Sequence, residues 1–468
     1  MFQQNKNKNK NKNKSRDRSR TFSLSILFLL SFLIHLNLVG ATTRSCQELL
    51  STKTTISTKV DVAPNTLDGE RFVNLSKEDI GSVKKDFDHN TNYTKELAET
   101  EIKDQCAYGA CWAFSTTTAL EKQVLKRTGK QIELNPDYVL AYQIIFKALE
   151  SIQWKEGFSE GDQLWAAFKY VKQMGIVPES VWQSKVDFRA RTQSARFTFY
   201  LQSLINKYQK ELEPVYEALA KFNEVSVNQA KPEMLAERDE LVKIVEQTMD
   251  LAFKDLVQFL TAYAGELPQK FEFDGKEYTP LEFQKEYVKL DQRSMLLLAP
   301  DLLSTKRSPP LSQRELARRK YFLEQIPKEV TFKKAGFEDM EKMIIQAIDA
   351  GEPVMLGIFW QNAFVDAKTG IMSLDAFHHP FENFQVDPVD VRERNLGNGL
   401  HAVIITGYEL GADGRVLKYK IHNSWGKKVG DEGYFHLYRD YFEAFVYQVG
   451  VYPQRLVVAA SEPSSITK

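Results

Sequence analysis

The sequence has little cysteine and no surplus of charge of either sign. Three cysteines occur in 468 residues, which excludes a disulfide-stabilised scaffold and a four-cysteine zinc or iron–sulfur site. Lys and Arg number 62, as do Asp and Glu, so the net charge is 0. A nucleic-acid binder needs a basic surplus for the phosphate backbone, so that class is not expected. Hydrophobic residues make up 43% of the chain, which is typical of a globular protein.

The N-terminus has the pattern of a targeting segment. Residues 1–20 are basic and low in complexity, and they predict a disordered tail. The apolar run at 22–34 is too short to span a membrane comfortably, and residues 39–41 (Val-Gly-Ala) offer a cleavage site. We therefore expect a signal peptide over 21–41 and an exported protein, either secreted or periplasmic. An uncleaved membrane anchor over 21–38 is the alternative.

A cysteine lies where a loop is expected to turn into a helix. Residues 104–121 read Asp-Gln-Cys-Ala-Tyr-Gly-Ala-Cys-Trp-Ala-Phe-Ser-Thr-Thr-Thr-Ala-Leu-Glu, and the pattern favours a helix from Trp112 onward. Cys111 would then feel the positive end of the helix dipole, which lowers a thiol pKa and favours the nucleophilic thiolate. The side-chain amide of Gln105 could fold back and form an oxyanion hole with the backbone N–H of Cys111. A buried structural cysteine is the alternative.

A histidine and an asparagine close two strands that are expected to be neighbours. The pattern predicts strands over 402–408 and 416–422, with a further strand at 433–438. Antiparallel pairing would place His401 beside Asn423, whose side chain would accept from one imidazole N–H and fix the ring. The other nitrogen would face the cysteine. Trp425 would cover the contact, and Trp112 is the second residue expected to shield the site. For His401 alone, a packed histidine at a strand end is the alternative.

Four separate blocks in this order resemble the signature of papain-like cysteine peptidases. They are Gln105 with Cys111-Trp112-Ala113-Phe114-Ser115, then His401-Ala402-Val403, then Asn423-Ser424-Trp425-Gly426, and finally Gly433-Tyr434. The resemblance implies an α+β fold of two lobes, helical behind Cys111 and an antiparallel β-sheet behind His401, with the cleft between them. It also implies a catalytic triad of Cys111, His401 and Asn423, assisted by Gln105, and no cofactor.

The interval between the cysteine and the histidine indicates a branch of that family. Cys111 and His401 lie 290 residues apart, a longer interval than plain papain-type enzymes have. Two apolar stripes at helical spacing occupy part of it and predict packed helices. They are Phe197, Leu201, Leu204, Ile205, Tyr208 and Leu212, and then Leu241, Val245, Met249, Phe253 and Val257 with Leu256 and Leu260 beside them. A long helical insertion is similar to the bleomycin hydrolase and aminopeptidase C branch.

These patterns divide the chain into seven expected segments. They are a disordered basic N-terminus at 1–20, a signal peptide or anchor at 21–41, a polar segment at 42–99, the helical lobe at 100–187, an inserted helical subdomain at 188–330, the β lobe at 331–455 and a C-terminal tail at 456–468.

Candidate substrate-binding residues follow from the same resemblance. The stretch beginning at Glu160 resembles a Gly-Gly-Gln region whose backbone binds the substrate chain in an extended pose. Gly161 and Asp162 are therefore candidates, as is Leu400 beside the histidine. Asp162 stands where the branch has a second glycine, so its carboxylate could capture a substrate amine or simply lie on the surface of a turn.

Two further sets of residues could form sites. The neighbours His378 and His379 would point in different directions on any regular element, so no metal site is expected there. Cys46 and Cys106 could pair in an oxidising compartment or remain free thiols.

The sequence thus predicts a cysteine-type peptidase that cleaves peptide bonds through a thioester acyl-enzyme, as an aminopeptidase or an endopeptidase. One alternative is a catalytically silent papain-like protein that binds peptides or a partner protein, and another is acyl transfer to an amine. The expected partners are a peptide or protein substrate, no nucleic acid, and a membrane only if the N-terminal apolar segment stays uncleaved. A homo-oligomer is left open, because the resembling branch forms hexameric cages.

Overall fold

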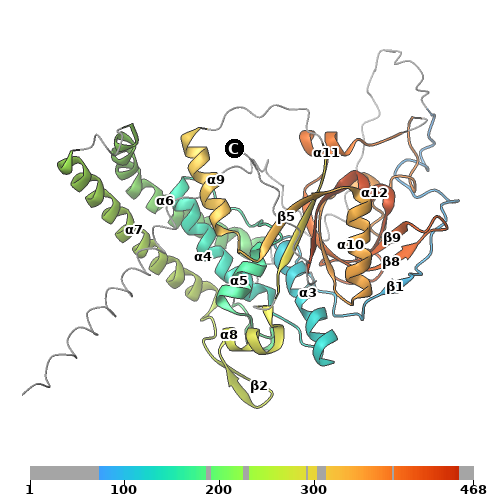
Figure 1. The fold of residues 1–468 in the computed structure, drawn as a ribbon, viewed down its shortest axis with the longest axis horizontal. Helices are drawn as coiled ribbons and strands as arrows, with labels where there is room; N and C mark the ends of the chain where they lie inside the picture. The colour runs from blue at the N-terminus through green and yellow to red at the C-terminus, as the bar shows by residue number, and fades with distance from the viewer. Residues whose placement is uncertain are drawn as a thin grey trace, which may run out of the picture.

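The fold has a helical lobe and a sheet lobe, and helix α3 (Cys111–Thr128) lies between them (Figure 1). A computed structural model describes residues 73–185, 191–224, 231–290, 293–302, 312–381 and 384–452. The predicted signal peptide at 21–41, Cys46 and the tail at 456–468 lie outside the described residues. Within them, no helix has the length and apolar character needed to cross a membrane.

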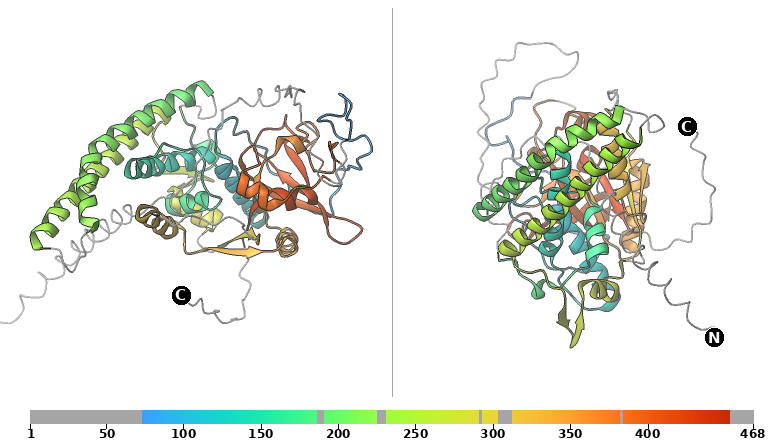
Figure 2. Two further views of the ribbon diagram at one scale, coloured as in Figure 1. Left: turned by 90° about the horizontal axis from the view of Figure 1, so that it is seen from above. Right: turned by 90° about the vertical axis from the view of Figure 1, so that its left-hand side faces the viewer.

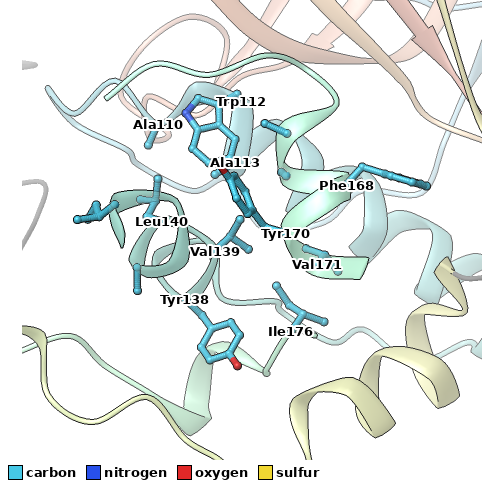
Figure 3. Close-up of a cluster of buried hydrophobic side chains, with 14 of the residues drawn as sticks. Ala110, Trp112, Ala113, Tyr138, Val139, Leu140, Phe168, Tyr170, Val171 and Ile176 are labelled. Atoms are coloured by element: carbon cyan, nitrogen blue, oxygen red, sulfur yellow. The ribbon is translucent and has the colours of Figure 1, made fainter. Parts of the chain in front are cut away.

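The helical lobe is built around helix α3, whose first residue is Cys111, the candidate nucleophile. It contains α3 (Cys111–Thr128), α4 (Pro136–Trp154), α5 (Ala166–Met174) and the short η1 (Glu179–Val181). The side chain of Asn135 caps α4 by accepting from the Tyr138 N–H at 2.9 Å, and Pro136 stands at the first turn. Helix α3 is buried along most of its length because it packs between the other helices and the sheet. Figure 3 shows Trp112 and Ala113 of α3 among side chains of α4 and α5.

The two apolar stripes form the long helices α6 (Arg191–Ala220) and α7 (Pro232–Ala264), with the short η2 (Lys221–Glu224) between them. These two helices run alongside each other at one edge of the molecule (Figure 2). The stripe on α6 is buried at Phe197, Leu201, Ile205, Tyr208 and Leu212. On α7 the buried row is Val245, Met249, Ala252, Leu256 and Leu260, whereas Phe253 and Val257 are exposed. A spacing of four residues drifts around a helix of 3.6 residues per turn, so the strict four-residue series leaves the buried face.

The helical part of the insertion ends before residue 330, which is the predicted boundary. After α7 the chain forms a two-stranded hairpin, β2 (Phe271–Phe273) and β3 (Lys276–Tyr278), followed by α8 (Pro280–Phe283) and the π-helical turn η4 (Gln284–Val288). Strand β4 (Met295–Pro300) then enters the main sheet, and α9 (Gln313–Gln325) returns to the helical lobe. The run Met-Leu-Leu-Leu-Ala is apolar throughout, and such a short run fits a buried strand as well as a helix.

The main sheet forms the second lobe and carries the candidate base. Its strands run in the order β5-β4-β11-β6-β8-β9-β10-β7, and β1 pairs with β8 off this path. Most neighbours are antiparallel, whereas β4–β5 and β10–β7 are parallel. The remaining strands are β1 (Lys95–Glu96), β5 (Val330–Ala335), β6 (Val354–Phe359), β7 (Ile371–Met372), β8 (Leu400–Leu410), β9 (Val416–His422), β10 (Tyr434–Tyr438) and β11 (Val446–Val451).

Short helices complete this lobe. They are α10 (Phe337–Asp349), η6 (Asn362–Phe364), α11 (Pro388–Arg394) and α12 (Arg439–Phe445). Helices α10 and α12 cover the sheet on the side that Figure 1 shows toward the viewer. The predicted strands at 402–408, 416–422 and 433–438 correspond to β8, β9 and β10. The α+β class and the two-lobe arrangement are confirmed.

Candidate active site

Cys111 is the first residue of α3, as the sequence predicts. The loop that leads to it is fixed by Glu160, which belongs to the segment after α4. The Gly109 N–H donates to Glu160 Oε2 at 3.0 Å, and the indole N–H of Trp112 donates to the Glu160 carbonyl at 3.2 Å. A Cβ at Gly109 would lie 3.2 Å from the Glu160 Cβ, so the loop can approach this closely because the residue is glycine.

His401 lies in β8 and contacts Asn423, which directly follows β9. The antiparallel register pairs Ile404 with His422, which brings Asn423 opposite the start of β8. His401 Nε2 and Asn423 Oδ1 are 2.7 Å apart, and the same oxygen also accepts from the Ser424 N–H at 2.8 Å. Because an amide oxygen only accepts, Nε2 carries the proton, and Nδ1 is left with a free lone pair.

The candidate nucleophile and base meet across the contact of α3 with β8. The backbone N–H of Ala402, the residue after His401, is close enough to Cys111 to lower the pKa of its thiol. Helix α3 also packs directly on this strand. The structure therefore places His401 beside Asn423, and it packs the helix that begins with Cys111 against the strand that carries His401.

Burial dominates the electrostatics of the pair. Burial raises the pKa of the Cys111 thiol, and the N–H groups of Ala402, Trp112 and Cys111 itself only partly counteract it. Burial also lowers the pKa of His401 to about 4, against a smaller opposing effect of the Asn423 hydrogen bond. The expectation of a thiol pKa lowered by the helix dipole is therefore not met, because loss of water outweighs the dipole. Both shifts favour the neutral thiol and the neutral imidazole.

Gln105 lies beside these residues and is held at both ends of its amide. Its Oε1 accepts from the Ser424 hydroxyl at 2.5 Å, and its Nε2 donates to the Tyr108 carbonyl at 2.8 Å. Its backbone N–H donates to the Ser424 carbonyl at 2.8 Å. The amide nitrogen has a second N–H, so one donor is left that Tyr108 does not use.

Aromatic rings surround His401. Trp425 stacks on the imidazole with ring centroids 4.6 Å apart and planes at 25°. Trp360, which sequence reasoning missed, lies edge-on to the same imidazole at 5.4 Å and 88°. Trp112 is placed elsewhere: it packs in the helical lobe against Tyr170, because a residue one position after Cys111 points about 100° away around the helix (Figure 3). It does not cover the His401–Asn423 contact.

The candidate substrate-binding residues lie at different depths. Leu400 is exposed at the start of β8. The Gly161 carbonyl accepts from Lys147 Nζ at 3.0 Å. The Asp162 carboxylate accepts from its neighbour's backbone N–H at 2.8 Å and from the Tyr170 hydroxyl at 3.4 Å, with Lys147 Nζ at 3.8 Å. This carboxylate is thus engaged inside the protein, which argues against both the capture of a substrate amine and a solvated turn.

The other weighed sites show ordinary contacts. Nε2 of His378 lies 3.8 Å from a carboxylate oxygen of Asp79, and the ring of His379 stacks on Phe384. In the part of the chain that the structure describes, no group of three or more His, Cys, Asp or Glu side chains could hold a metal ion. Cys106 and Cys111 are not bridged to each other, and Cys46 lies outside the described residues.

Comparisons with known proteins identify the family of the chain. The model of the Peptidase C1-like family matches residues 149–463, which is more than half of the chain and includes His401 and Asn423. "Cysteine proteinase 1, mitochondrial" from Saccharomyces cerevisiae is 23% identical over 380 residues, covering 75% of this chain and 74% of the relative. Aminopeptidase C from Lactobacillus helveticus is 24% identical over 395 residues, covering 76% and 80%.

A solved structure supports the fold. The crystal structure of PepW from Lactobacillus rhamnosis superposes with a TM-score of 0.57 at 20% identity, covering 77% of this chain and 82% of that one. One prediction is overturned: the expectation of export is wrong, since the yeast relative is named as a mitochondrial protein. The family assignment rests on the family match and on the two enzyme relatives together. The chain belongs to the Peptidase C1-like family and is a papain-like cysteine peptidase.

Proposed function

We propose that this chain hydrolyses peptide bonds with Cys111 as the nucleophile and His401 as the general base and acid. The observation that carries the proposal is the packing of α3 on β8, which sets the helix that begins with Cys111 against the strand of His401, whose Nε2 lies 2.7 Å from Asn423 Oδ1. The hydrogen bond to Asn423 uses Nε2, so Nδ1 is the nitrogen that is free to take a proton from the thiol.

The first half of the reaction forms a thioester. As the Cys111 sulfur attacks the peptide carbonyl carbon, its proton moves to Nδ1 of His401, and the carbonyl oxygen becomes an oxyanion. The backbone N–H of Cys111 and the unused amide N–H of Gln105 donate to that oxyanion. The C–N bond then breaks, and the imidazolium gives its proton to the leaving amine.

The second half regenerates the thiol. Neutral His401 takes a proton from water as the hydroxyl oxygen attacks the thioester carbon, and the sulfur leaves and recovers a proton from the imidazolium. Burial raises the pKa of the Cys111 thiol and lowers that of His401 to about 4, and both shifts favour neutral groups before the substrate binds. Asn423 stabilises the imidazolium in each half because its oxygen accepts from the Nε2 proton.

The proposal is tested with full-length protein under reducing conditions and two matched peptides, one with a free and one with an acetylated N-terminus. Cys111→Ala is expected to lower kcat by about 10⁴ or more, as for removal of a catalytic nucleophile. Cys106→Ser is the control, since it removes the other described thiol and is expected to leave cleavage within about threefold. Turnover that survives in Cys111→Ala would refute the mechanism.

The two peptides decide the mode of cleavage. Cleavage of the free N-terminus alone indicates an aminopeptidase, as the name of the bacterial relative suggests. Cleavage of the acetylated peptide indicates an endopeptidase. If neither peptide is cleaved and Cys111 also fails to react with an alkylating agent, the chain is a silent binding protein instead.

A further inference from the structure

The ring of Trp360 lies against two other rings of the proposed catalytic site, those of His401 and Trp425. It directly follows β6, and its side chain is almost completely buried. Its ring lies edge-on to His401 at 5.4 Å and 88°, and it meets the Trp425 ring at 4.6 Å and 65°. Trp425 in turn stacks on the imidazole with ring planes at 25°. The imidazole therefore has one indole on its face and another in a perpendicular orientation.

Trp360 is itself held from three directions. Its backbone N–H donates to the Gly399 carbonyl at 2.8 Å, and its carbonyl accepts from the Asn398 N–H at 2.6 Å. Its indole N–H donates to Asn362 Oδ1 at 2.9 Å. Residues 398 and 399 lie just before His401, so the same tryptophan is tied to the backbone that carries the histidine and to the histidine ring.

We infer that Trp360 is a positioning residue for His401, which rests on the proposed function above. The hydrogen bond from Nε2 to Asn423 fixes one atom of the ring and still permits the ring to tilt about that contact. Stacking on Trp425 fixes the plane, and the perpendicular Trp360 closes the remaining direction of movement. Nδ1 is thereby kept toward Cys111. A contact of this kind contributes beyond the area that it buries, because aromatic pairs have preferred geometries.

Trp360 also excludes water from the imidazole. The influences on the pKa of His401 are burial, which lowers it, and the Asn423 hydrogen bond, which raises it. The indoles of Trp360 and Trp425 supply much of the apolar surface in contact with this ring. Movement of the ring and entry of water would therefore follow together from the loss of Trp360.

The test is the pH dependence of Cys111 alkylation by iodoacetamide, read for the Cys111 peptide by mass spectrometry in the full chain. At pH 6 an isolated thiol is almost entirely protonated, so the rate there depends on His401, and His401→Ala gives the baseline without it. At pH 10 hydroxide competes for the thiol proton, so the rate there depends much less on His401.

We expect Trp360→Leu to lower the His401-dependent rate at pH 6 roughly threefold to tenfold, the range of one aromatic contact, and to leave the rate at pH 10 nearly unchanged. Trp360→Phe keeps a ring edge and is expected to recover most of the pH 6 rate. Trp154→Leu is the matched control, because Trp154 is similarly buried in a separate small cluster with Tyr321.

A structural role alone predicts a different result. If Trp360→Leu changed the rate by the same factor at both pH values, or no more than Trp154→Leu does, the inference would be wrong. If wild type and His401→Ala reacted equally at pH 6, the proposed catalytic pair would fail, and the role of Trp360 with it. A pH 6 rate that depends on His401 and is unaffected by Trp360→Leu overturns the inference alone.

Discussion

The Cys111 side of the site is held mainly by charged and polar groups, whereas the His401 side is held mainly by aromatic rings. On the first side, the buried Lys103 Nζ lies 2.8 Å from Glu121 of α3 and 2.6 Å from Glu179, and the loop before Cys111 is fixed by Glu160. On the second side, Trp360 and Trp425 flank His401, and Nε2 of its ring is hydrogen-bonded to the neutral amide of Asn423.

This difference follows from what each side has to do. The loop before Cys111 must keep backbone N–H groups in fixed directions, and directional hydrogen bonds and ion pairs achieve that. In the proposed mechanism His401 alternates between a neutral and a charged ring, and a formal charge in contact would bias it toward one of these states. Rings and an amide dipole restrain the imidazole without adding such a charge.

The largest test breaks the ionic anchor on the Cys111 side. Burial lowers the pKa of Lys103, but Glu121 and Glu179 raise it by more, so Lys103 stays charged. Lys103→Met would leave Glu121 buried without its partner, and we expect the free energy of unfolding in urea to fall by about 3–5 kcal/mol. Adding Glu121→Gln should recover part of that loss, because the unpaired charge is removed.

The matched control is an ion pair at the surface. Lys270 and Glu277 lie 2.7 Å apart with side chains 62% and 64% exposed, so Lys270→Met should cost about 1 kcal/mol or less. An equal, small effect of the two lysine substitutions would show that the buried pair is no anchor and that the two sides do not differ in this way.

The second test measures how acid lowers the free energy of unfolding through the buried histidines of the sheet lobe. Burial lowers the pKa of His401 to about 4, of His422 to about 3 and of His436 to about 4. Each folded pKa lies below the unfolded value of about 6.5, so the unfolded chain takes up protons first as the pH falls. The stability is therefore complete above about pH 6.5 and is lost toward pH 4, by up to about 1.4 kcal/mol per pH unit for each histidine.

Acid should have the opposite effect on stability at Glu160, on the Cys111 side. Burial raises the pKa of Glu160, so protonation in acid relieves a cost there. Urea unfolding between pH 4.5 and 7.5 measures the sum, and His422→Leu, which removes one titrating group, should flatten the slope. A slope that His422→Leu leaves unchanged would mean that this buried histidine does not contribute.

The sequence patterns predict the strands β8 and β9 that carry His401 and lead to Asn423. They do not predict Trp360, which lies beside His401. Two β-branched runs joined by a Gly411–Gly414 turn fix their own pairing, and that pairing places Asn423 beside His401. Trp360 could not be found in the same way. It reaches His401 through the pairing of β6 with β8, which are far apart in the sequence and whose register no short turn specifies.

Two further differences have the same physical origin. Strand β4 was included in the helical insertion, because its apolar run carries no periodicity that separates a strand from a helix. The Asp162 carboxylate turns inward because Tyr170 and Lys147 reach it from α5 and α4, and such contacts depend on the packing of helices rather than on local sequence. Local pattern therefore specifies elements and their close pairings, and packing decides what encloses the site.

The smallest test concerns the contact that joins the two sides. The Ser424 hydroxyl, next to Asn423, donates to Oε1 of Gln105 at 2.5 Å, so the sheet side helps to orient the proposed oxyanion donor of the Cys111 side. Ser424→Ala removes this bond and leaves the Tyr108 carbonyl as the partner of the Gln105 amide. We expect kcat for peptide cleavage to fall roughly threefold to tenfold with little change in KM, as for loss of one hydrogen bond in the transition state.

Ser373→Ala is the control, since the Ser373 hydroxyl is also buried and donates to Asp440 instead of Gln105. The loss of this hydrogen bond is expected to lower stability, but kcat of the folded enzyme should stay close to wild type. If Ser424→Ala also leaves kcat at the wild-type value, the Tyr108 contact alone orients Gln105. Each side would then position its own groups independently, and the aromatic and ionic anchors would be separate devices joined only by the closeness of α3 and β8.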